Sequence, residues 1–378
     1  MTLSTDVVVI GAGLTGASAA WAISRAGRSV VLLEARGFGH RQGSSHGTER
    51  IFRRVYPDPH YLALTGQAER SWHTLEADAG THLLRVTGGI DHGAGRDVPD
   101  LARLLTAEGV RHEVLTPEQA AERWPGFAFG GPVLHQPDAG VIDADATVAT
   151  LLETARRRGA RTLEHAPVEA VETAGNHAVV HPAGGAEPIL ARRVVLAVGG
   201  WLPELAPGIP VRLPPLEVTQ QQVYHFAQRD PRAVWPTLVH DEGMLVYGLP
   251  SGADGGPRPA VKVARHHGGT RTTASGRTGV VDAADRERVT AYVRDWLPGL
   301  HPEPVAEATC LYTSTADEDF VLDRRGPLVV ASPCSGHGAK FAPLLGEMIR
   351  DLAVYDAAAH PRFALDRPGP ARPVGQRV

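Results

Sequence analysis

The stretch DVVVIGAGLTGASAAWAISRAGRSVVLLEARG, residues 6–37, decides the fold. Residues 6–10 form an almost continuous apolar run, which is typical of a parallel strand buried on both faces. Residues 14–26 predict a helix with small side chains on one face, and residues 29–34 form a second apolar run. The order strand, helix, strand predicts a β–α–β unit and therefore an α/β fold that contains a parallel sheet.

Three glycines follow the first predicted strand with the spacing G-x-G-x-x-G, at Gly11, Gly13 and Gly16. The first permits a tight turn, the second lets a pyrophosphate approach the backbone, and the third permits close packing of helix on strand. Glu34 ends the second strand, where a carboxylate would bind ribose hydroxyls. These features predict a dinucleotide site. The carboxylate disfavours the 2′-phosphate of NADP, whereas FAD and NAD both fit the motif.

The composition excludes several classes of protein. The chain has 378 residues with a formal net charge of −4, whereas a nucleic-acid-binding domain would carry a basic excess. No apolar run approaches the roughly 20 residues that span a bilayer, and the start MTLSTDVVVIGAG does not resemble a secretion leader. The two cysteines, Cys310 and Cys334, make neither a disulfide framework nor a metal motif. We therefore expect a cytoplasmic protein without a metal site, a nucleic-acid partner or a membrane partner.

Beyond the β–α–β unit, helices and strands alternate without internal repeats. Residues 39–58 are polar and predict a long ordered loop, and residues 167–185 alternate as in a β-hairpin. Residues 191–205 predict a buried strand followed by a short helix, and residues 326–354 predict a strand, a glycine loop and a helix. Further helices are predicted at residues 60–80, 99–108, 143–160 and 282–296, and most of residues 213–311 otherwise favours strands.

Lysine is nearly absent from the chain. Of the 38 basic residues, only Lys262 and Lys340 are lysines. This usage resembles that of GC-rich genes, in which a surface cation can change to arginine at little cost. The two lysines that remain are therefore candidates for sites that need a compact ammonium rather than a planar guanidinium.

Four segments together resemble one known family. GSSHGTERIFRRVY (43–56), VYGLPSGADGGPRPAVKVARHH (246–267), CLYTSTADEDFVLD (310–323) and SGHGAKFAPLLGE (335–347) occur in the order and at the spacing found in monomeric sarcosine oxidases and N-methyltryptophan oxidases. That family belongs to the D-amino-acid-oxidase-like, FAD-dependent amine oxidoreductases. The resemblance extends from residue 6 to about residue 366, so it implies FAD as the cofactor.

The resemblance also implies roles for individual residues. Cys310 lies in the C-x-Y-T motif whose cysteine usually carries the flavin through its 8α-methyl group, so we expect covalent FAD. Lys262 matches the lysine above the flavin that assists the reaction with O2, where a fixed positive charge stabilises the developing superoxide. Arg53 and Lys340 match the pair that holds the substrate carboxylate. The remaining implied residues are Arg50, His266 and Tyr247 at the catalytic centre, and Ser44, His46, Val168, Gly199, Gly336 and Gly338, together with Lys340, around the cofactor.

Several positions depart from the family pattern. Glu49 stands where the family has threonine, and it could pair with Arg50 or admit a substrate with a second cation. Gln221 and Gln222 replace the usual Arg-Gln, Ser45 replaces one histidine of a pair, and the insertion-like SGADGGPRP (251–259) precedes Lys262. These departures leave the flavin chemistry in place but put sarcosine itself in doubt. The lone Cys334 matches no family ligand and is interpreted as a packing residue.

The resemblance implies a two-domain fold: a Rossmann-like FAD domain and a substrate domain with a mixed, mostly antiparallel sheet. We expect residues 1–82, 141–212 and 312–368 in the FAD domain, residues 83–140 and 213–311 in the substrate domain, and a tail at 369–378. The implied activity is oxidation of an N-methyl, cyclic or related amino acid, with hydride transfer to flavin N5, an imine product and H2O2 from O2. We expect a monomer. The alternatives are a dehydrogenase of the same fold, a non-catalytic flavin protein and a nicotinamide enzyme.

Overall fold

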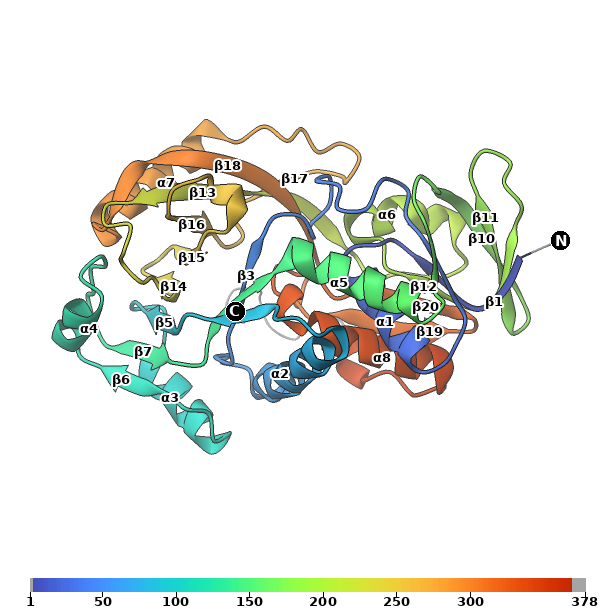
Figure 1. Cartoon of the computed structure of the whole chain (residues 1–378), viewed down its shortest axis with the longest axis horizontal. Coiled ribbons are helices and arrows are strands. Elements are labelled where there is room, and N and C mark those ends of the chain that lie inside the picture. Colours follow the sequence, from blue (N-terminus) through green and yellow to red (C-terminus); the bar gives the residue numbers. More distant parts are fainter. Residues whose placement is uncertain (1–2, 369–378) are drawn as a thin grey trace.

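The computed structural model describes residues 3–368, and its two large sheets lie at opposite ends of the long axis (Figure 1). In the first sheet β1 pairs in parallel with β2 and β12, and β12 pairs in parallel with β20. The hairpin β10–β11 extends one edge in antiparallel fashion, as predicted. The strands of this sheet are β1 (Leu3–Ile10), β2 (Val30–Leu33), β9 (Arg161–Leu163), β10 (Val168–Ala174), β11 (His177–Pro182), β12 (Ile189–Leu196), β19 (Val321–Arg325) and β20 (Leu328–Ser332).

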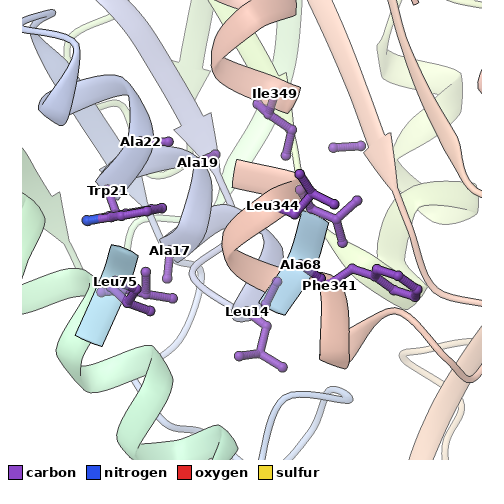
Figure 2. Close-up of a cluster of buried hydrophobic side chains, with 14 of the residues drawn as sticks. Leu14, Ala17, Ala19, Trp21, Ala22, Ala68, Leu75, Phe341, Leu344 and Ile349 are labelled. Atoms are coloured by element: carbon purple, nitrogen blue, oxygen red, sulfur yellow. The ribbon is translucent and has the colours of Figure 1, made fainter. Parts of the chain in front are cut away.

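Helices on the first sheet form the largest core. Here α1 (Leu14–Arg25) connects β1 to β2 and packs against α5 (Ala144–Arg157) and α8 (Ala342–Val354), while α2 (Pro59–Ala79) covers α8. Figure 2 shows the interleaved side chains, with Trp21 of α1 near Leu75 of α2 and Leu344 of α8 beside Phe341. The predicted helix start at residue 143 is confirmed, because the Asp143 carboxylate accepts a hydrogen bond from the Ala146 N–H.

Replacing Gly346 with alanine should destabilise the protein. Gly346 lies where α8 crosses α1, and a Cβ there would be 2.3 Å from the backbone oxygen of Ser18. We expect a loss of about 1–3 kcal/mol in the free energy of unfolding, measured by urea denaturation, although alanine favours helix more than glycine does. Gly131→Ala is the matched control because a Cβ there meets no atom within 4 Å. An equal effect of both substitutions would contradict this account of the helix crossing.

The second sheet is mostly antiparallel, with a parallel pairing between β5 and β14. Its strands are β5 (Gly89–His92), β6 (Glu113–Leu115), β7 (Val133–Gln136), β13 (Glu217–Gln228), β14 (Thr237–Asp241), β15 (Leu245–Pro250), β16 (Ala260–Arg265), β17 (Thr270–Arg271) and β18 (Leu300–Ser314). The helices at this end of the molecule are α3 (Val98–Ala107), α4 (Pro117–Arg123) and α7 (Ala283–Trp296) (Figure 1). The predicted fold class, a Rossmann-like unit plus a mixed, mostly antiparallel sheet, is confirmed.

Two elements differ from the prediction. The predicted loop at residues 39–58 contains the strand β3 (Glu49–Phe52), which pairs with β8 (Gly140–Asp143) in a small third sheet completed by β4 (Leu84–Val86). Figure 1 shows β3 between the two large sheets. The prediction missed this strand because its pairing partner lies about ninety residues further along the chain. The prediction also missed α4, although a capping box at Thr116 and Gln119 marks its start.

The third sheet joins segments that the domain prediction assigns to different domains, so those boundaries stay a prediction. The predicted tail lies outside the described residues. The remaining elements are short: the α-helical turn α6 (Leu202–Leu205) and the 3-10 turns η1 (Gly199–Trp201), η2 (Ala206–Gly208), η3 (Ala253–Gly255), η4 (Ala339–Phe341) and η5 (Pro361–Phe363).

Candidate functional site

Two adjoining cavities contain nearly all the predicted site residues. The glycine-loop cavity is lined by Gly11, Gly13, Glu34, Val168 and Gly199, among others. The lysine cavity, between the two large sheets, is lined by both lysines and by Arg50, Arg53, Tyr247, His266, His46, Cys310, Gly336 and Gly338. The cavities share the lining residues Leu14, Thr15, Ser44, Ser45 and Cys334, so they form one continuous site.

The glycine loop has the predicted geometry. Gly11 has φ +96°, and a Cβ there would lie 2.5 Å from the oxygen of Ala197. Gly16 does not line either cavity but packs against the loop, since its Cβ would meet the Gly11 oxygen at 1.9 Å. The Glu34 carboxylate is only 6% exposed and accepts hydrogen bonds from the N–H groups of Ala12 and Arg36. These bonds fix one carboxylate against the loop, where it faces the cavity.

The segment Gly39–Gly47 forms a wall of both cavities and is tied to the second sheet. The Ser44 hydroxyl donates to the Leu311 carbonyl at 2.6 Å, and Arg277 donates to the carbonyls of Arg41 and Gly43. Arg50 donates to the carbonyls of Ser44 and His46 at 2.9 and 2.7 Å. The Arg50 guanidinium therefore both shapes this segment and contributes a positive charge to the lysine cavity.

Lys262 lies on β16 with its ammonium buried in the lysine cavity. The residue is 4% exposed, and Nζ lies 2.9 Å from Asp254 Oδ2 and 3.3 Å from the carbonyl oxygen of Glu49. Burial, and then the charge of Arg50, lower the pKa of Lys262, whereas Asp254 acts in the opposite direction. A lysine ammonium has three N–H groups, so these two contacts leave one for an occupant of the cavity.

The suggested pairing of Glu49 with Arg50 is wrong. The Glu49 carboxylate instead pairs with Arg85 at 3.1 Å, and the hydrogen bond from Arg50 to Glu49 goes to the backbone carbonyl. The reason is the strand β3, in which neighbouring side chains point to opposite faces. Burial raises the pKa of Glu49.

Arg53 and Lys340 are brought together, as predicted, and both contact the aromatic ring of Tyr56. Lys340 Nζ donates to the Tyr56 hydroxyl at 2.8 Å and to the His337 carbonyl at 3.0 Å. Arg53 pairs with Asp91 at 3.0 Å, but the same Asp91 oxygen also pairs with Arg96 at 2.6 Å. The neighbouring Arg54 pairs with Glu69 at 3.5 Å and does not line the cavity.

The positive charge of this corner exceeds the negative charge. Arg53 and Arg96 share the Asp91 carboxylate, the Asp241 carboxylate also acts on Arg96, and no residue between 3 and 368 forms an ion pair with Lys340. Burial, and then Arg53, lower the pKa of Lys340 well below its ordinary value. Like charges buried together destabilise one another unless an anion lies between them. The corner is therefore suited to bind an anion such as a carboxylate.

Neutral, hydrogen-bonding rings form the rest of the wall. Burial, and then His267, lower the pKa of His266 well below its ordinary value, and burial lowers the pKa of His46 to about 4. Both imidazoles are therefore neutral near pH 7. In the described part of the chain, His266 Nε2 and His46 Nε2 are buried without a hydrogen-bond partner. Such atoms are costly unless a bound molecule satisfies them, so they fit a polar ligand in the cavity.

Cys310 lies on β18 within reach of three positive charges. Burial raises the pKa of its thiol, whereas Arg50, Arg277 and Lys262 act in the opposite direction. Cys334, interpreted from the sequence as a packing residue, lines both cavities, and burial raises the pKa of its thiol to about 11. Both cysteines are unpaired.

Sequence reasoning missed three contributors to the lysine cavity. Tyr312 lies two residues after Cys310 on the same strand, so the period of a strand could have placed both on one face. His337 lies between the two predicted glycines of GHG, and its Nδ1 is 3.2 Å from the Tyr56 hydroxyl. Asp254 is in the insertion-like segment, and no sequence signal identified its contact with Lys262.

In the part of the chain that the structure describes, no helix has both the length and the apolar character needed to cross a membrane.

A glycine loop after a parallel strand, a buried carboxylate at the end of the next strand and a cation-rich cavity beside them are typical of a dinucleotide-dependent oxidoreductase. The family described as FAD dependent oxidoreductase matches residues 6–352, and the chain belongs to it. FAD is therefore the cofactor, and the nicotinamide alternative is excluded.

Known relatives cover almost the whole chain. Human peroxisomal sarcosine oxidase is 29% identical over 92% of this chain and 92% of its own. Monomeric sarcosine oxidase of Streptomyces avermitilis is 30% identical over 96% of both chains, and N-methyl-L-tryptophan oxidase of Yersinia pestis is 30% identical over 97% of this chain and 96% of its own. The open form of NikD, an amino acid oxidase of nikkomycin biosynthesis, superposes with a TM-score of 0.85 at 28% identity, over 96% of this chain and 98% of NikD. These relatives confirm the predicted enzyme class, the FAD-dependent amine oxidases.

Proposed function

We propose that this chain oxidises an amino acid with a secondary amine, N-methylated or cyclic, or a closely related amino acid, and that O2 is reduced to H2O2. The observation that carries the proposal is the buried ammonium of Lys340, which lies beside Arg53 and has no ion pair within residues 3–368, and which therefore favours a substrate carboxylate. The names of the relatives, sarcosine oxidase and N-methyl-L-tryptophan oxidase, favour a secondary amine. We propose a monomer that works in the cytoplasm.

The residues that would hold FAD extend across both cavities. Gly11, Gly13 and Glu34 would bind the pyrophosphate and adenosine part of FAD, because the backbone lies close around the glycine loop there. The buried Nε2 of His46 has no hydrogen-bond partner within the described residues, which favours a polar group of the cofactor beside the wall segment Gly39–Gly47. FAD supplies the two-electron acceptor for the substrate hydride, and the chain supplies binding, orientation and charge.

The chain's own groups would favour a neutral substrate amine. With the carboxylate held by Arg53 and Lys340, a nearby ammonium would be disfavoured by the same cations. The neutral His266, with its unsatisfied Nε2, can accept a hydrogen bond from the amine without adding charge. An amine with a free lone pair assists release of hydride from the adjacent C–H, and the product is then an imine that water hydrolyses.

The experiment for this proposal is anaerobic mixing of the holoenzyme with N-methyl and cyclic amino acids, followed by admission of air. We expect bleaching of the flavin with at least one substrate that carries a carboxylate, no bleaching with the decarboxylated amine, and one H2O2 per turnover. Rapid dye reduction without peroxide would instead establish a dehydrogenase. Failure of every amino acid to bleach the flavin would contradict catalysis and establish a flavin-binding protein.

We further propose that Cys310 carries FAD covalently. The natural protein precipitated in acid should keep its yellow colour in the pellet, and Cys310→Ser should lose it because serine is a far weaker nucleophile than a thiolate. Cys334→Ser is the matched control, since Cys334 lines the same cavity and should leave the pellet yellow. Release of the colour from the natural protein would exclude covalent attachment. Loss of colour only in Cys334→Ser would assign the attachment to the other cysteine.

A further inference from the structure

The segment Ser251–Pro259 delivers a carboxylate to Lys262. Asp254, in the turn η3, contacts Lys262 Nζ through Oδ2 at 2.9 Å, and its other oxygen accepts a hydrogen bond from the Thr48 hydroxyl at 2.6 Å. The Thr48 N–H also donates to Asp254 Oδ2 at 3.3 Å. Asp254 therefore connects the ammonium on β16 to Thr48, which lies between the wall segment Gly39–Gly47 and β3.

The glycine backbone of the segment lies close against neighbouring side chains. A Cβ on Gly252 would lie 2.3 Å from Thr48 Oγ1, and a Cβ on Gly255 would lie 2.6 Å from Ser251 Cβ. Ser251 Oγ in turn lies 2.8 Å from His225 Nδ1. The glycines of this segment thus permit an approach that brings the Asp254 side chain to the lysine.

Asp254 is the carboxylate that directly contacts the Lys262 ammonium in the described residues. Arg50 acts on Lys262 as a like charge, and the Glu49 carboxylate, which pairs with Arg85, raises the pKa of Lys262 less than Asp254 does. His225 lies 3.9 Å from Asp254, but burial lowers its pKa to about 4, so it is neutral near pH 7. The other titratable groups that interact with Lys262 are His46 and Cys310, and neither is an anion near pH 7.

A buried ammonium beside a guanidinium loses its proton readily unless an opposite charge compensates it. We propose that Asp254 is a positioning residue that keeps Lys262 protonated and directed into the lysine cavity, where the ammonium faces O2. The proposal rests on the proposed oxidase function. It assigns an electrostatic task to the segment Ser251–Pro259, which the sequence marked only as an insertion-like departure from the family pattern.

The scarcity of lysine permits a direct test on the holoenzyme. Protein grown with lysine labelled with ¹³C at Cε should give two NMR signals, which Lys262→Met and Lys340→Met assign by the loss of one each. With increasing pH, the Lys262 signal should change to that of the neutral amine at lower pH in Asp254→Asn than in the natural protein. Asp254→Glu should restore much of the natural titration because it keeps the charge.

Asp285→Asn is the matched control. Asp285 is also a buried carboxylate, and it lies at the same end of the molecule as the second sheet. It pairs with Arg265 at 2.6 Å and does not line the lysine cavity. Its replacement should leave the Lys262 titration unchanged. If Asp254→Asn does not fold, Asp254→Ser provides the same loss of charge in a smaller side chain. A Lys262 titration that is the same with and without the Asp254 carboxylate, or equally shifted in Asp285→Asn, would overturn the proposal.

Rapid kinetics separates this proposal from the proposed function. In Asp254→Asn at pH 8, reoxidation of the reduced flavin by O2 should slow about tenfold, whereas anaerobic reduction by substrate should change less. The decline of the reoxidation rate with pH should move to lower pH, parallel to the NMR titration. If the natural protein oxidises no amino acid, the proposed function fails, but the lysine titration still decides whether Asp254 holds the charge.

Discussion

Lys340→Met is expected to raise the substrate concentration that half-reduces the flavin about 100-fold, because it removes one of the two cations assigned to the carboxylate. Lys340 forms no ion pair within residues 3–368, so the substitution leaves no protein carboxylate unpaired. Methionine fills a similar buried volume beside Tyr56. Anaerobic titration of the flavin absorbance measures the effect.

Arg54→Met is the matched control, since Arg54 is adjacent to Arg53 in the sequence but pairs with Glu69 outside the cavity. It should leave substrate binding unchanged. The pH dependence supplies a second check. Because the pKa of Lys340 is depressed, its charge is present at low pH and is lost as the pH rises through that depressed value. Carboxylate binding should therefore weaken at a lower pH than for an ordinary lysine, and Lys340→Met should abolish that dependence. Unchanged binding in Lys340→Met would remove Lys340 from the carboxylate site.

Lys262→Met is expected to slow reoxidation of the reduced flavin by O2 about 100-fold while leaving reduction by substrate largely intact. The reason is that a fixed positive charge stabilises negative charge that develops on oxygen, and a preorganised group of this kind contributes several kcal/mol. Stopped-flow absorbance measures the two half-reactions separately. The effect should exceed that of Asp254→Asn, since the charge itself is removed rather than its partner.

Lys262→Arg is the informative comparison, because it keeps the charge but replaces a compact ammonium by a planar guanidinium. We expect an intermediate reoxidation rate. If Lys262→Met leaves both half-reactions unchanged, the assigned role of Lys262 is wrong. If it slows only reduction, Lys262 belongs to the substrate site instead.

The local patterns predicted the first sheet well. An apolar run, a glycine loop and a second apolar run dictate β1, α1 and β2 through neighbouring residues alone. The predicted hairpin and helix 143–160 were likewise set by alternation and by a capping aspartate. The strand β3 was missed because its four residues, two polar and then two hydrophobic, show no alternation, and pairing with β8 decides their conformation.

In the candidate site, too, local motifs were predictive whereas long-range contacts were not. The motifs predicted which residues gather, and both lysines, Arg50, Arg53, His266 and Tyr247 line one cavity. The partners of these residues could not be predicted, because Asp91 lies outside the quoted segments and nothing in the segment 246–267 indicates that Asp254 contacts Lys262. Asp91 reaches Arg53 from β5, and Asp254 reaches Lys262 from a glycine-rich turn. Charge compensation in a buried site depends on how the chain folds in three dimensions, which residue spacing along the sequence does not reveal.

The placement of both lysines in one cavity has a practical consequence. Lys262 is 4% exposed and Lys340 is 7% exposed, and the chain has no other lysine. The outer surface therefore offers no lysine to succinimidyl esters, aldehyde cross-linkers or amine-coupling sensor chips. A dye that does attach to a lysine of the folded protein must have entered the cavity, so the extent of such labelling measures access to the site, and protection from it reports an occupant.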